Sequence, residues 1–552
     1  MKWRFPFLYL ALLLTFGILA FRLFNLTVLE GSHNRQLADE QRVRLHKISA
    51  PRGMIFDQNS QPLVRNIPIF KECPSGWDET QEKSQCKTIT REEALKLEVQ
   101  GKDAQLLVEI GREYLQKEAM AHLLGYLGEV TADEIAKPKC PEKTYQLGDL
   151  VGRTGIEEQY ECFLRGVDGA ELIEVDTHGL TLRKIGRREP VAGQDIFLSV
   201  DASLQQAAYE ALKMTKGYPE GVARGAVVAS DPKTGQILAL VSGPSYEPNL
   251  MARADAEEAG KVEEIFQDPG KPFFNRATSG SYPPGSTFKI VTSAAALEEG
   301  KITAETKIED PGQIVIGQYR FANWYFTSSG KTEGSINLVR AIARSTDTFF
   351  YKVGELVGAT KLVSWGKAFG LGRPSGIDLP GEISGFLPDP TTTDWFLGNT
   401  YHLSIGQGSL GVTPLQLNMV ASVIASGGEL CQPHVAQQTT RLSARQADNK
   451  QQSNCQDLKL KPETLKLITE GMKGACSPGG TAGVLFNFNP PVACKTGTAE
   501  FNDPKGRTHA WLTAFAPADN PEIVVTALVE AGGEGSSVAA PIVKRVLEEY
   551  FR

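Results

Sequence analysis

The sequence predicts a multidomain α+β protein that is anchored in a membrane by an N-terminal helix. First, its 552 residues correspond to roughly three to four domains of about 150 residues each. Second, the chain begins with an apolar run that is long enough to span a bilayer. Third, β-rich runs, turns and helix-periodic segments are mixed over the remainder, which is typical of α+β folds.

The apolar run extends from Phe5 to Phe21 without a charge and resumes after Arg22. Its uncharged part spans about 26 Å, close to the thickness of the hydrocarbon layer, and Arg22 can snorkel. A cleaved signal peptide is the alternative, but no clear A-x-A cleavage site follows. We expect a cytoplasmic tail over residues 1–4 and an uncleaved anchor over residues 5–29. Because long domains translocate largely regardless of loop charge, we expect a single-pass protein of the cytoplasmic (inner) membrane, with its N-terminus inside and its bulk outside.

The eight cysteines indicate disulfide bonds. They form four couples of sequence neighbours: Cys73 and Cys86, Cys140 and Cys162, Cys431 and Cys455, Cys476 and Cys494. An even number of cysteines outside the cytoplasm is typical of a disulfide framework, and we expect Cys73–Cys86 and Cys431–Cys455 in particular. Buried free thiols are the alternative. A zinc site is not expected, because the chain has no C-x-x-C and its seven histidines lack metal-ligand spacing.

Residues 30–200 are expected to form an extended pedestal of mixed α/β structure. Residues 41–66 alternate in polarity around a polar turn, which predicts a strand, a loop and a second strand. Residues 91–135 are expected to be helical, and a strand followed by a helix capped by Asp201 or Ser203 comes next. This portion pairs no nucleophile with a base, so we expect it to support a site rather than to form one.

Residues 201–552 are expected to form a larger second domain. The residue pattern changes near residue 222, where two β-rich runs flank a D-P-x-x-G turn. Residues 508–530 predict two strands about a Pro/Asn turn, and residues 536–552 carry apolar side chains at helical spacing. The net charge of −7 and the lack of a Lys/Arg block argue against nucleic-acid binding.

The first candidate for chemistry is Ser286-x-x-Lys289, in the stretch SYPPGSTFKIVTSAAALEEG. Ser286 follows a Pro-Pro-Gly turn and opens an apolar helical run, so we expect it at a helix N-terminus, where free N–H groups favour negative charge. Lys289 returns to the same face about 5–6 Å away, as a base beside a nucleophile must. Three other Ser-x-x-Lys copies lack this context. A capping serine and a solvated lysine are the alternative.

A second motif, Ser345-Thr346-Asp347, precedes a helical aromatic run. Serine, threonine and aspartate often hydrogen-bond to the backbone at helix ends, so capping is the ordinary interpretation of this motif alone.

A third motif, Lys495-Thr496-Gly497 followed by Thr498, lies in a stretch that predicts a strand. A glycine at a strand position suggests that another group approaches the backbone closely. An earlier Lys-Thr-Gly copy at residues 233–235 has turn chemistry instead, and we expect its lysine in solvent.

In this order, Ser286-x-x-Lys289, Ser345-x-Asp347 and Lys495-Thr496-Gly497 resemble the three motifs of penicillin-binding transpeptidases. The stretches APRGMIFDQNSQPL, GRTGIEEQYECFLRGVDGAELIEVDTHG, LSIGQGSLGVTPLQLNMVASVIASGG and SPGGTAG are similar to other parts of the same family. No glycosyltransferase domain precedes residue 200, so the chain is most similar to the class B, monofunctional group and to its elongation-type penicillin-binding protein 2. The resemblance implies that residues 201–552 form an antiparallel sheet flanked by helices.

The resemblance also implies a serine-type D-Ala–D-Ala transpeptidase that cross-links peptidoglycan stem peptides during cell-wall elongation and cell-shape maintenance, without a cofactor, and that β-lactams inhibit. Within it, Ser286 is the expected nucleophile, Lys289 the expected base and Ser345 a proton relay. The expected substrate-binding residues are Lys495, Thr496, Gly497 and Thr498. Further candidates for the cleft are Gln407, His509 and Trp511, for which core packing is the alternative.

Two departures from the general family pattern matter. Asp347 stands where an asparagine is usual, so a carboxylate can pair with Lys289 or Lys495 and oppose deprotonation of Lys289. Some relatives carry a zinc site of Asp, His and Cys between the first two motifs. Here Asp310 remains, but no His or Cys occurs up to Thr346, so no metal is expected.

Other functions stay open at this stage. A division-type transpeptidase or a D,D-carboxypeptidase shares the acylation step, so both remain alternatives. A serine β-lactamase with a deacylating glutamate would need a Glu-x-x-Leu-Asn motif after the second motif, and we do not find one. The alternative from another class is a non-enzymatic scaffold for a glycan polymerase. The expected partners are stem peptides, β-lactams, the membrane, and, by resemblance, a multi-span glycan polymerase with other elongation-complex proteins.

Overall fold

The computed structural model describes residues 4–74, 86–102, 105–175, 181–215, 222–253, 259–392, 394–437 and 454–552. Two compact units are present. The first unit comprises residues 1–53, 66–111 and 165–194, and the second comprises residues 54–65, 112–164 and 195–552.

The first unit begins with an apolar helix. Helix α1 (Arg4–Phe24) continues through the short π-helix η1 (Asn25–Leu29), and the segment Phe7–Leu29 is the one helix of the described residues that is long and apolar enough to cross a membrane. Its large apolar side chains are exposed, as expected for a helix that meets lipid rather than a protein core.

The remainder of the first unit contains a three-stranded antiparallel sheet, two helices and strands of a second sheet. The sheet has the order β1-β8-β9, with Leu45 of β1 opposite Leu172 of β8. The elements are α2 (Gly31–Arg42), β1 (Val43–Ile48), β4 (Lys87–Ile89), α3 (Arg91–Val99), β8 (Gly169–Val175) and β9 (Thr181–Arg188).

The prediction that residues 91–135 are helical is wrong for the middle of that range. Helix α3 ends at Val99, and β5 (Leu106–Tyr114) is a strand. The physical reason lies in the local pattern, because the β-branched residues Val108 and Ile110 alternate with Glu109 at a period of two. The predicted strand, loop and strand over residues 41–66 are confirmed as β1 and β3 (Pro62–Glu72), with the short β2 (Ile55–Phe56) between them.

In the second unit, residues 112–164 fold into short elements, and β10 (Ile196–Phe197) pairs in parallel with β2. These elements are η4 (Lys117–Ala119), α4 (Ala121–Leu124), β6 (Leu127–Glu129), α5 (Ala132–Ala136), β7 (Leu150–Gly152), α6 (Gly155–Gln159) and α7 (Glu161–Leu164). Helix α8 (Ala202–Lys213) then begins after Asp201, whose carboxylate accepts hydrogen bonds from two backbone N–H groups and so caps it as predicted.

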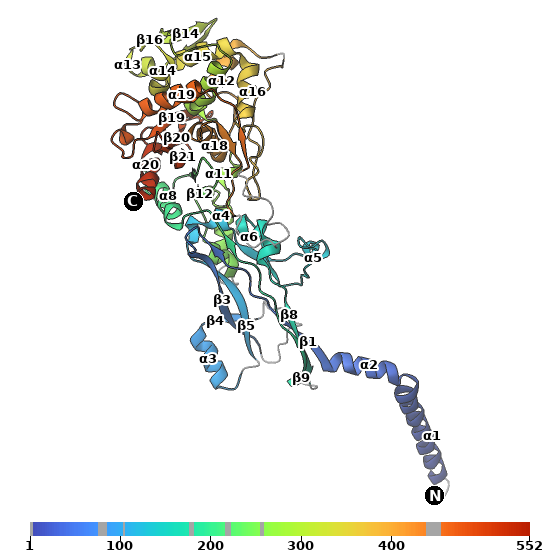
Figure 1. The fold of residues 1–552 in the computed structure, drawn as a ribbon. Helices are drawn as coiled ribbons and strands as arrows, with labels where there is room; N and C mark the ends of the chain where they lie inside the picture. The colour runs from blue at the N-terminus through green and yellow to red at the C-terminus, as the bar shows by residue number, and fades with distance from the viewer. Residues whose placement is uncertain are drawn as a thin grey trace. The chain divides into compact units, whose positions relative to one another are not determined.

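A five-stranded antiparallel sheet forms the centre of the second unit, in the order β12-β11-β21-β20-β19 (Figure 1). Its strands are β11 (Gly225–Ser230), β12 (Ile237–Gly243), β19 (Ala493–Glu500), β20 (Thr508–Ala516) and β21 (Ile523–Val529). Helices α8 and α20 (Ala539–Tyr550) pack on one face, and α18 (Pro414–Ala425) packs on the other. Successive residues of β21, such as Val524 and Val525, enter different cores, as the two-residue period of a strand requires. The predicted antiparallel sheet flanked by helices is confirmed.

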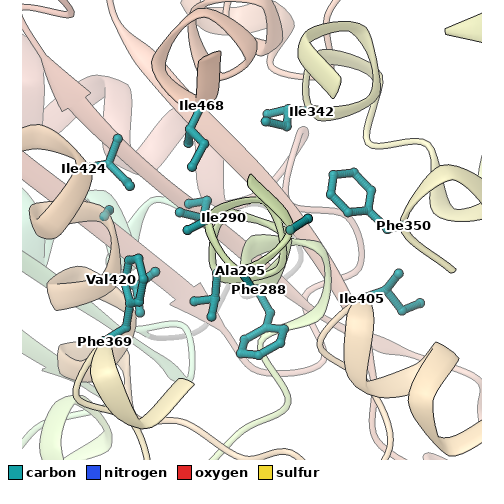
Figure 2. Close-up of a cluster of buried hydrophobic side chains, with 14 of the residues drawn as sticks. Phe288, Ile290, Ala295, Ile342, Phe350, Phe369, Ile405, Val420, Ile424 and Ile468 are labelled. Carbon is teal, nitrogen blue, oxygen red and sulfur yellow. The ribbon is translucent and has the colours of Figure 1, made fainter. Parts of the chain in front are cut away.

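A helical layer on the α18 side surrounds one buried helix, α12 (Lys289–Glu298). Its sequence is rich in alanine, the best helix former, and every residue from Lys289 to Leu297 is buried. Figure 2 shows Ile290 and Ala295 of this helix among side chains from several neighbouring segments. The surrounding helices are α14 (Leu338–Arg344), α15 (Asp347–Val357), α16 (Ala359–Ala368), α17 (Leu397–Ser404) and α19 (Pro462–Ala475).

The remaining elements of the second unit are small hairpins and short helices. They are α9 (Pro248–Arg253), α10 (Ala259–Gln267), α11 (Arg276–Ser279), η5 (Gly285–Phe288), β13 (Ile308–Asp310), β14 (Gln313–Ile316), β15 (Tyr319–Ala322), α13 (Trp324–Ser329), β16 (Gly334–Ile336), β17 (Glu429–Cys431), β18 (Cys455–Asp457) and η6 (Gly483–Leu485).

All eight cysteines are paired, and each pairs with its neighbour in the sequence. The expected bonds Cys73–Cys86 and Cys431–Cys455 are confirmed. Cys140 with Cys162 and Cys476 with Cys494 form the other two. The last bond ties the end of α19 to the strand that carries Lys495.

Candidate active site

Ser286 lies in η5, directly before the buried helix α12, so the expected position at a helix N-terminus is confirmed. The turn before it depends on Gly285, whose φ of +55° favours glycine. A Cβ on Gly285 would lie 2.8 Å from the carbonyl oxygen of Thr498, so glycine also lets this turn approach β19 closely. Ser286 itself is half-buried, beside N–H groups that have no partner within the helix.

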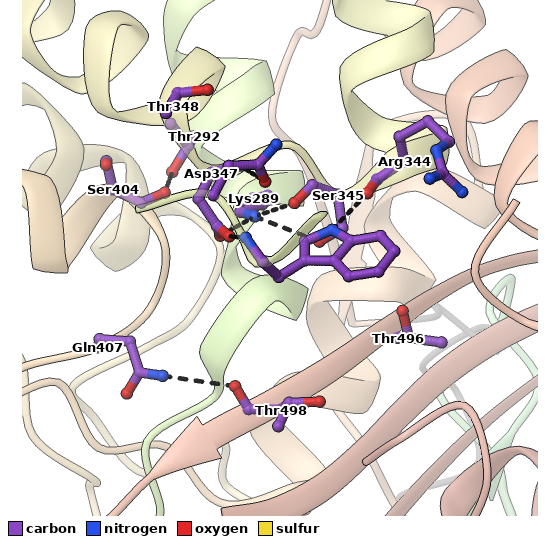
Figure 3. Close-up of polar contacts among 12 residues, drawn as sticks. Lys289, Thr292, Arg344, Ser345, Asp347, Thr348, Ser404, Gln407, Thr496 and Thr498 are labelled. Carbon is purple, nitrogen blue, oxygen red and sulfur yellow. Dashed lines mark hydrogen bonds and ion pairs between the residues drawn. The ribbon is translucent and has the colours of Figure 1, made fainter. Parts of the chain in front are cut away.

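Lys289 is fully buried one helical turn after Ser286. Its ammonium donates hydrogen bonds to the backbone oxygen of Ser345 at 2.8 Å and to the Ser345 hydroxyl at 3.2 Å, and it forms an ion pair with the Asp347 carboxylate at 2.7 Å (Figure 3). The ring of Phe350 lies 5.2 Å from the same nitrogen. The solvated-lysine alternative is therefore wrong, and Asp347 pairs with Lys289 rather than with Lys495.

Ser345 joins the two lysines of the site. It lies at the junction of α14 and α15 with a left-handed φ of +56°. Its hydroxyl oxygen accepts hydrogen bonds from Lys289 and, at 2.9 Å, from Lys495. Since its oxygen receives two protons, its own proton is left to donate. The motif therefore does more than cap a helix: Ser345 and Asp347 contact the buried lysines.

Burial governs the protonation of both lysines. Burial lowers the pKa of Lys289, and the Asp347 carboxylate opposes this shift. Burial and the positive charge of Lys289 together hold the pKa of Lys495 well below its usual value. The cluster therefore favours a neutral amine beside a protonated one, which is what proton transfer between neighbouring groups requires.

Strand β19 presents the third motif at the edge of the sheet. Lys495 is fully buried, whereas Thr498 is exposed. The Thr496 hydroxyl is hydrogen-bonded to the hydroxyl of Thr481 at 2.8 Å. A Cβ on Gly497 would lie 3.0 Å from the Pro284 oxygen, which confirms the predicted close approach at this glycine.

The three further cleft candidates differ in position. Gln407 donates a hydrogen bond to the carbonyl oxygen of Thr498 at 3.4 Å, so it lies beside the third motif. His509 is 6% exposed and stacks on Phe501. Trp511 is fully buried on β20, and its indole N–H donates to the Pro283 oxygen in the turn before Ser286. The structure thus places Trp511 behind the turn, in the core.

The earlier Lys-Thr-Gly copy lies in the turn between β11 and β12, as predicted. Gly235 has a φ of +79°, and the Asp231 carboxylate accepts hydrogen bonds from the Lys233 backbone and the Thr234 hydroxyl. Lys233 is exposed, and its ammonium donates to Asn520 at 3.0 Å.

Several residues near the site were not singled out from the sequence. Trp324 donates a backbone hydrogen bond to Asp347 at 3.2 Å, and its ring lies 5.3 Å from the Arg344 guanidinium. Thr481 contacts Thr496, as described above. No local pattern marks Trp324, whereas Thr481 lies within the stretch SPGGTAG that carried part of the family resemblance.

Comparisons with known proteins agree with this arrangement. Residues 225–548 match the family model for the penicillin-binding protein transpeptidase domain, and residues 69–198 match that for the penicillin-binding protein dimerisation domain. A peptidoglycan D,D-transpeptidase MrdA from Acinetobacter baumannii is 32% identical, over 97% of this chain and 85% of its own length.

Solved structures give the same result. The penicillin-binding protein PBP2 of Helicobacter pylori, in a complex with MreC, has a TM-score of 0.78 at 27% identity and covers 92% of this chain and 99% of its own. A chain of a peptidoglycan synthase complex that coordinates polymerization and crosslinking has a TM-score of 0.78 at 30% identity, over 100% of this chain and 98% of its own. The chain therefore belongs to the penicillin-binding protein transpeptidase family.

Proposed function

We propose that this protein is a peptidoglycan D,D-transpeptidase of the elongation type, which cross-links stem peptides through an acyl-enzyme on Ser286. The relatives named MrdA and the structural similarity to PBP2 support this function. The observation that carries it is the contact of both buried lysines with the hydroxyl of Ser345, next to a helix that begins at Ser286.

In the first step, the Ser286 Oγ attacks the carbonyl carbon of the penultimate D-Ala of a stem peptide. Its proton passes to Lys289 in the form of the lysine pair in which Lys289 is neutral and Lys495 carries the proton. The carbonyl oxygen becomes an oxyanion, which the backbone N–H groups of Ser286 and Thr498 stabilise. Each such donor lowers the activation free energy by about 3–4 kcal/mol. The C–N bond then breaks. Ser345 gives a proton to the departing amine and is reprotonated through the lysine cluster, so terminal D-Ala leaves and an ester remains on Ser286.

In the second step, an amine of a neighbouring stem peptide attacks the ester carbonyl. The amine loses a proton to the lysine cluster, the ester C–O bond breaks, and Ser286 regains its proton. A new amide joins the two stems. The reaction breaks one amide bond and forms another, without oxidation or reduction, so it needs no cofactor.

The third motif is proposed to hold the terminal carboxylate of the donor stem. Thr496 and Thr498 offer hydroxyl groups at the edge of β19. Lys495 supplies positive charge behind them in the form of the lysine pair in which it carries the proton. Gln407, through its contact with Thr498, is proposed to fix that edge. A β-lactam mimics the D-Ala–D-Ala dipeptide and so traps Ser286 as a stable ester.

We further propose that residues 1–4 form a cytoplasmic tail, residues 5–29 an anchor in the inner membrane, residues 30–200 a pedestal outside it and residues 201–552 the catalytic domain. The apolar helix and the two family matches support this division. An MreC-like protein and a glycan polymerase are the proposed partners, since structural relatives occur in complexes of these kinds.

Labelling with a fluorescent penicillin tests the proposal. The full chain in detergent should take up label covalently, and Ser286→Ala should abolish the uptake. Label that persists in the Ala variant would refute the nucleophile assignment. Release of the label within seconds would favour a β-lactamase, and a wild-type protein that never reacts would favour a non-enzymatic scaffold.

A further inference from the structure

The carboxylate of Asp310, at the end of β13, is the centre of a compact hydrogen-bond network. Asp310 is 2% exposed. Its Oδ1 accepts from the Gly312 N–H at 2.9 Å and from the Thr348 hydroxyl at 2.7 Å. Its Oδ2 accepts from the Asn323 side-chain amide at 3.0 Å and from the Glu333 N–H at 2.8 Å. A carboxylate has about four acceptor sites, so the four donors satisfy it fully.

Two of these donors lead directly to the second motif. Thr348 follows Asp347 in the first turn of α15. Asn323 donates to Asp310 with its side-chain N–H and uses its side-chain oxygen to accept the Asp347 backbone N–H at 3.2 Å. We call residues 345–348 the Ser345 segment. It is held to Asp310 directly through Thr348, which lies 38 residues away along the chain, and indirectly through Asn323 at Asp347.

The third donor leads to the wall beside the site. The side chain of Glu333 is buried and pairs with Arg344 at 2.6 Å and with Arg340 at 2.9 Å. Arg344 precedes Ser345 and lies against the ring of Trp324. The Asp310 carboxylate thus contacts segments that approach the Ser345 segment from both sides.

Asp310 remains ionised in this environment. Burial raises the pKa of its carboxyl, but the hydrogen bonds from Glu333, Thr348, Gly312 and Asn323 outweigh burial and lower it overall. A carboxylate accepts stronger hydrogen bonds than a neutral group does, so the ionised form suits its position at the centre of four donors.

We infer that Asp310 is a positioning residue of the reaction, which acts through Asn323 and Thr348 to hold Ser345 and Asp347 against the two buried lysines. It reaches no reacting atom itself. Its effect on catalysis passes through the geometry of the Lys289–Asp347 pair and of the Ser345 hydroxyl. The inference rests on the proposed function, since acylation is its first readout.

The groups that set the charge on Lys289 are few. Asp347 approaches from α15, Lys495 from β19, and the Phe350 ring from α15. Asp347 is the one of these three that raises the pKa of Lys289 by its charge. If the Ser345 segment is no longer held by Asp310, Asp347 withdraws from Lys289. Lys289 then loses its proton at lower pH, and the acidic limb of the acylation profile moves towards acid.

The first test measures the second-order rate of penicillin acylation against pH for the full chain with Asp310→Asn. The amide keeps the shape but turns one acceptor oxygen into an N–H donor. At least one of the four hydrogen bonds, that from a backbone N–H, is then lost, because a backbone N–H cannot turn to accept whereas the Thr348 hydroxyl can. We expect acylation to slow by about 10- to 100-fold, as for displacements below 1 Å at a reacting centre, with the acidic limb displaced. Glu309→Gln, an exposed carboxylate on the same strand, is the matched control and should behave as wild type.

A second pair of variants keeps the inference testable if Asp310→Asn does not fold. Thr348→Val removes one hydroxyl donor and preserves shape, whereas Thr348→Ser retains the hydroxyl. We expect the Val variant to acylate several-fold more slowly with a displaced limb, and the Ser variant to restore both. A loss of stability alone would lower the amount of active protein without moving the limb.

Hydrogen–deuterium exchange gives a readout that does not depend on acylation. The Asp347 amide is expected to exchange faster in Asp310→Asn, or in Thr348→Val, than in wild type. Unchanged exchange in the Ser345 segment, with acylation within twofold of wild type at every pH, would overturn the inference. A wild type that takes no label would refute the proposed function instead, and the exchange comparison would still decide whether Asp310 holds this segment.

Discussion

Gly497→Ala is the substitution whose effect follows most directly from the structure. The added Cβ would lie 3.0 Å from the Pro284 oxygen, the Thr287 methyl group and the Trp511 Cβ. A Cβ at 3.0 Å from a neighbour is too close, so each of the three must move by a few tenths of an ångström. Two of them belong to the turn around Ser286 and one to β20, so the strand and the turn are forced apart.

This displacement is expected to cost about 1–3 kcal/mol of stability, as for other overpacked positions. Its effect on chemistry should be larger, because it separates the third motif from the nucleophile. We expect the second-order rate of acylation by penicillin, per mole of folded protein, to fall by about tenfold or more. The assay is the second-order labelling rate, corrected for the folded fraction from urea unfolding.

Gly186→Ala in β9 is the matched control, because a Cβ on that strand glycine would have no neighbour within 4 Å. It should leave the labelling rate unchanged. A Gly497→Ala protein that labels at the wild-type rate would refute the reasoning, since β19 and the Ser286 turn would then tolerate separation.

Three further predictions follow from the site and its surroundings. Asp347→Asn removes the carboxylate that raises the pKa of Lys289, so the acidic limb of the acylation profile should move to lower pH; a limb that stays or moves up would contradict this role. Replacing both Cys476 and Cys494 by Ser removes a cross-link between residues 18 apart, which should lower the urea unfolding free energy by about 3 kcal/mol; no loss relative to wild type would contradict a stabilising role of this bond. Burial lowers the pKa of His509 to about 4, below its unfolded value of 6.5. Its contribution to stability is therefore fully present above about pH 6.5, where the histidine is neutral in both states. This contribution, about 3 kcal/mol, is lost as the pH falls towards 4. His509→Gln should flatten that part of the stability profile, and an unchanged slope would refute the prediction.

The sequence predicts which motifs form the site and their order along the chain more completely than it predicts the contacts between their side chains. The three motifs and the close approach at Gly497 were predicted, because each depends on a local pattern of a few residues. The partner of Asp347 was open between Lys289 and Lys495, since the choice depends on how α15 packs against α12. The role of Asp310 could not be predicted either, because its partners come from three separate segments that only the fold brings together.

The same distinction explains the errors in secondary structure and in burial. The helical prediction for residues 91–135 followed the long polar stretch and missed the alternation around Glu109. On β20 the residues from His509 to Ala516 are all buried, since helices cover both faces of the sheet. A strand buried on both faces shows no polar alternation, so the position of Trp511 in the core could not be predicted from its neighbours.

The most direct test of the central claim is the reaction of the full chain with a D-Ala–D-Ala stem peptide and an acceptor peptide with a free amine. Mass spectrometry of the quenched protein should find the donor peptide, less one D-Ala, as an ester on the peptide that contains Ser286, and the released product should be a cross-linked dimer. Free D-Ala with a hydrolysed donor and no dimer would identify a carboxypeptidase. Cross-linking that continues in Ser286→Ala would contradict the account altogether.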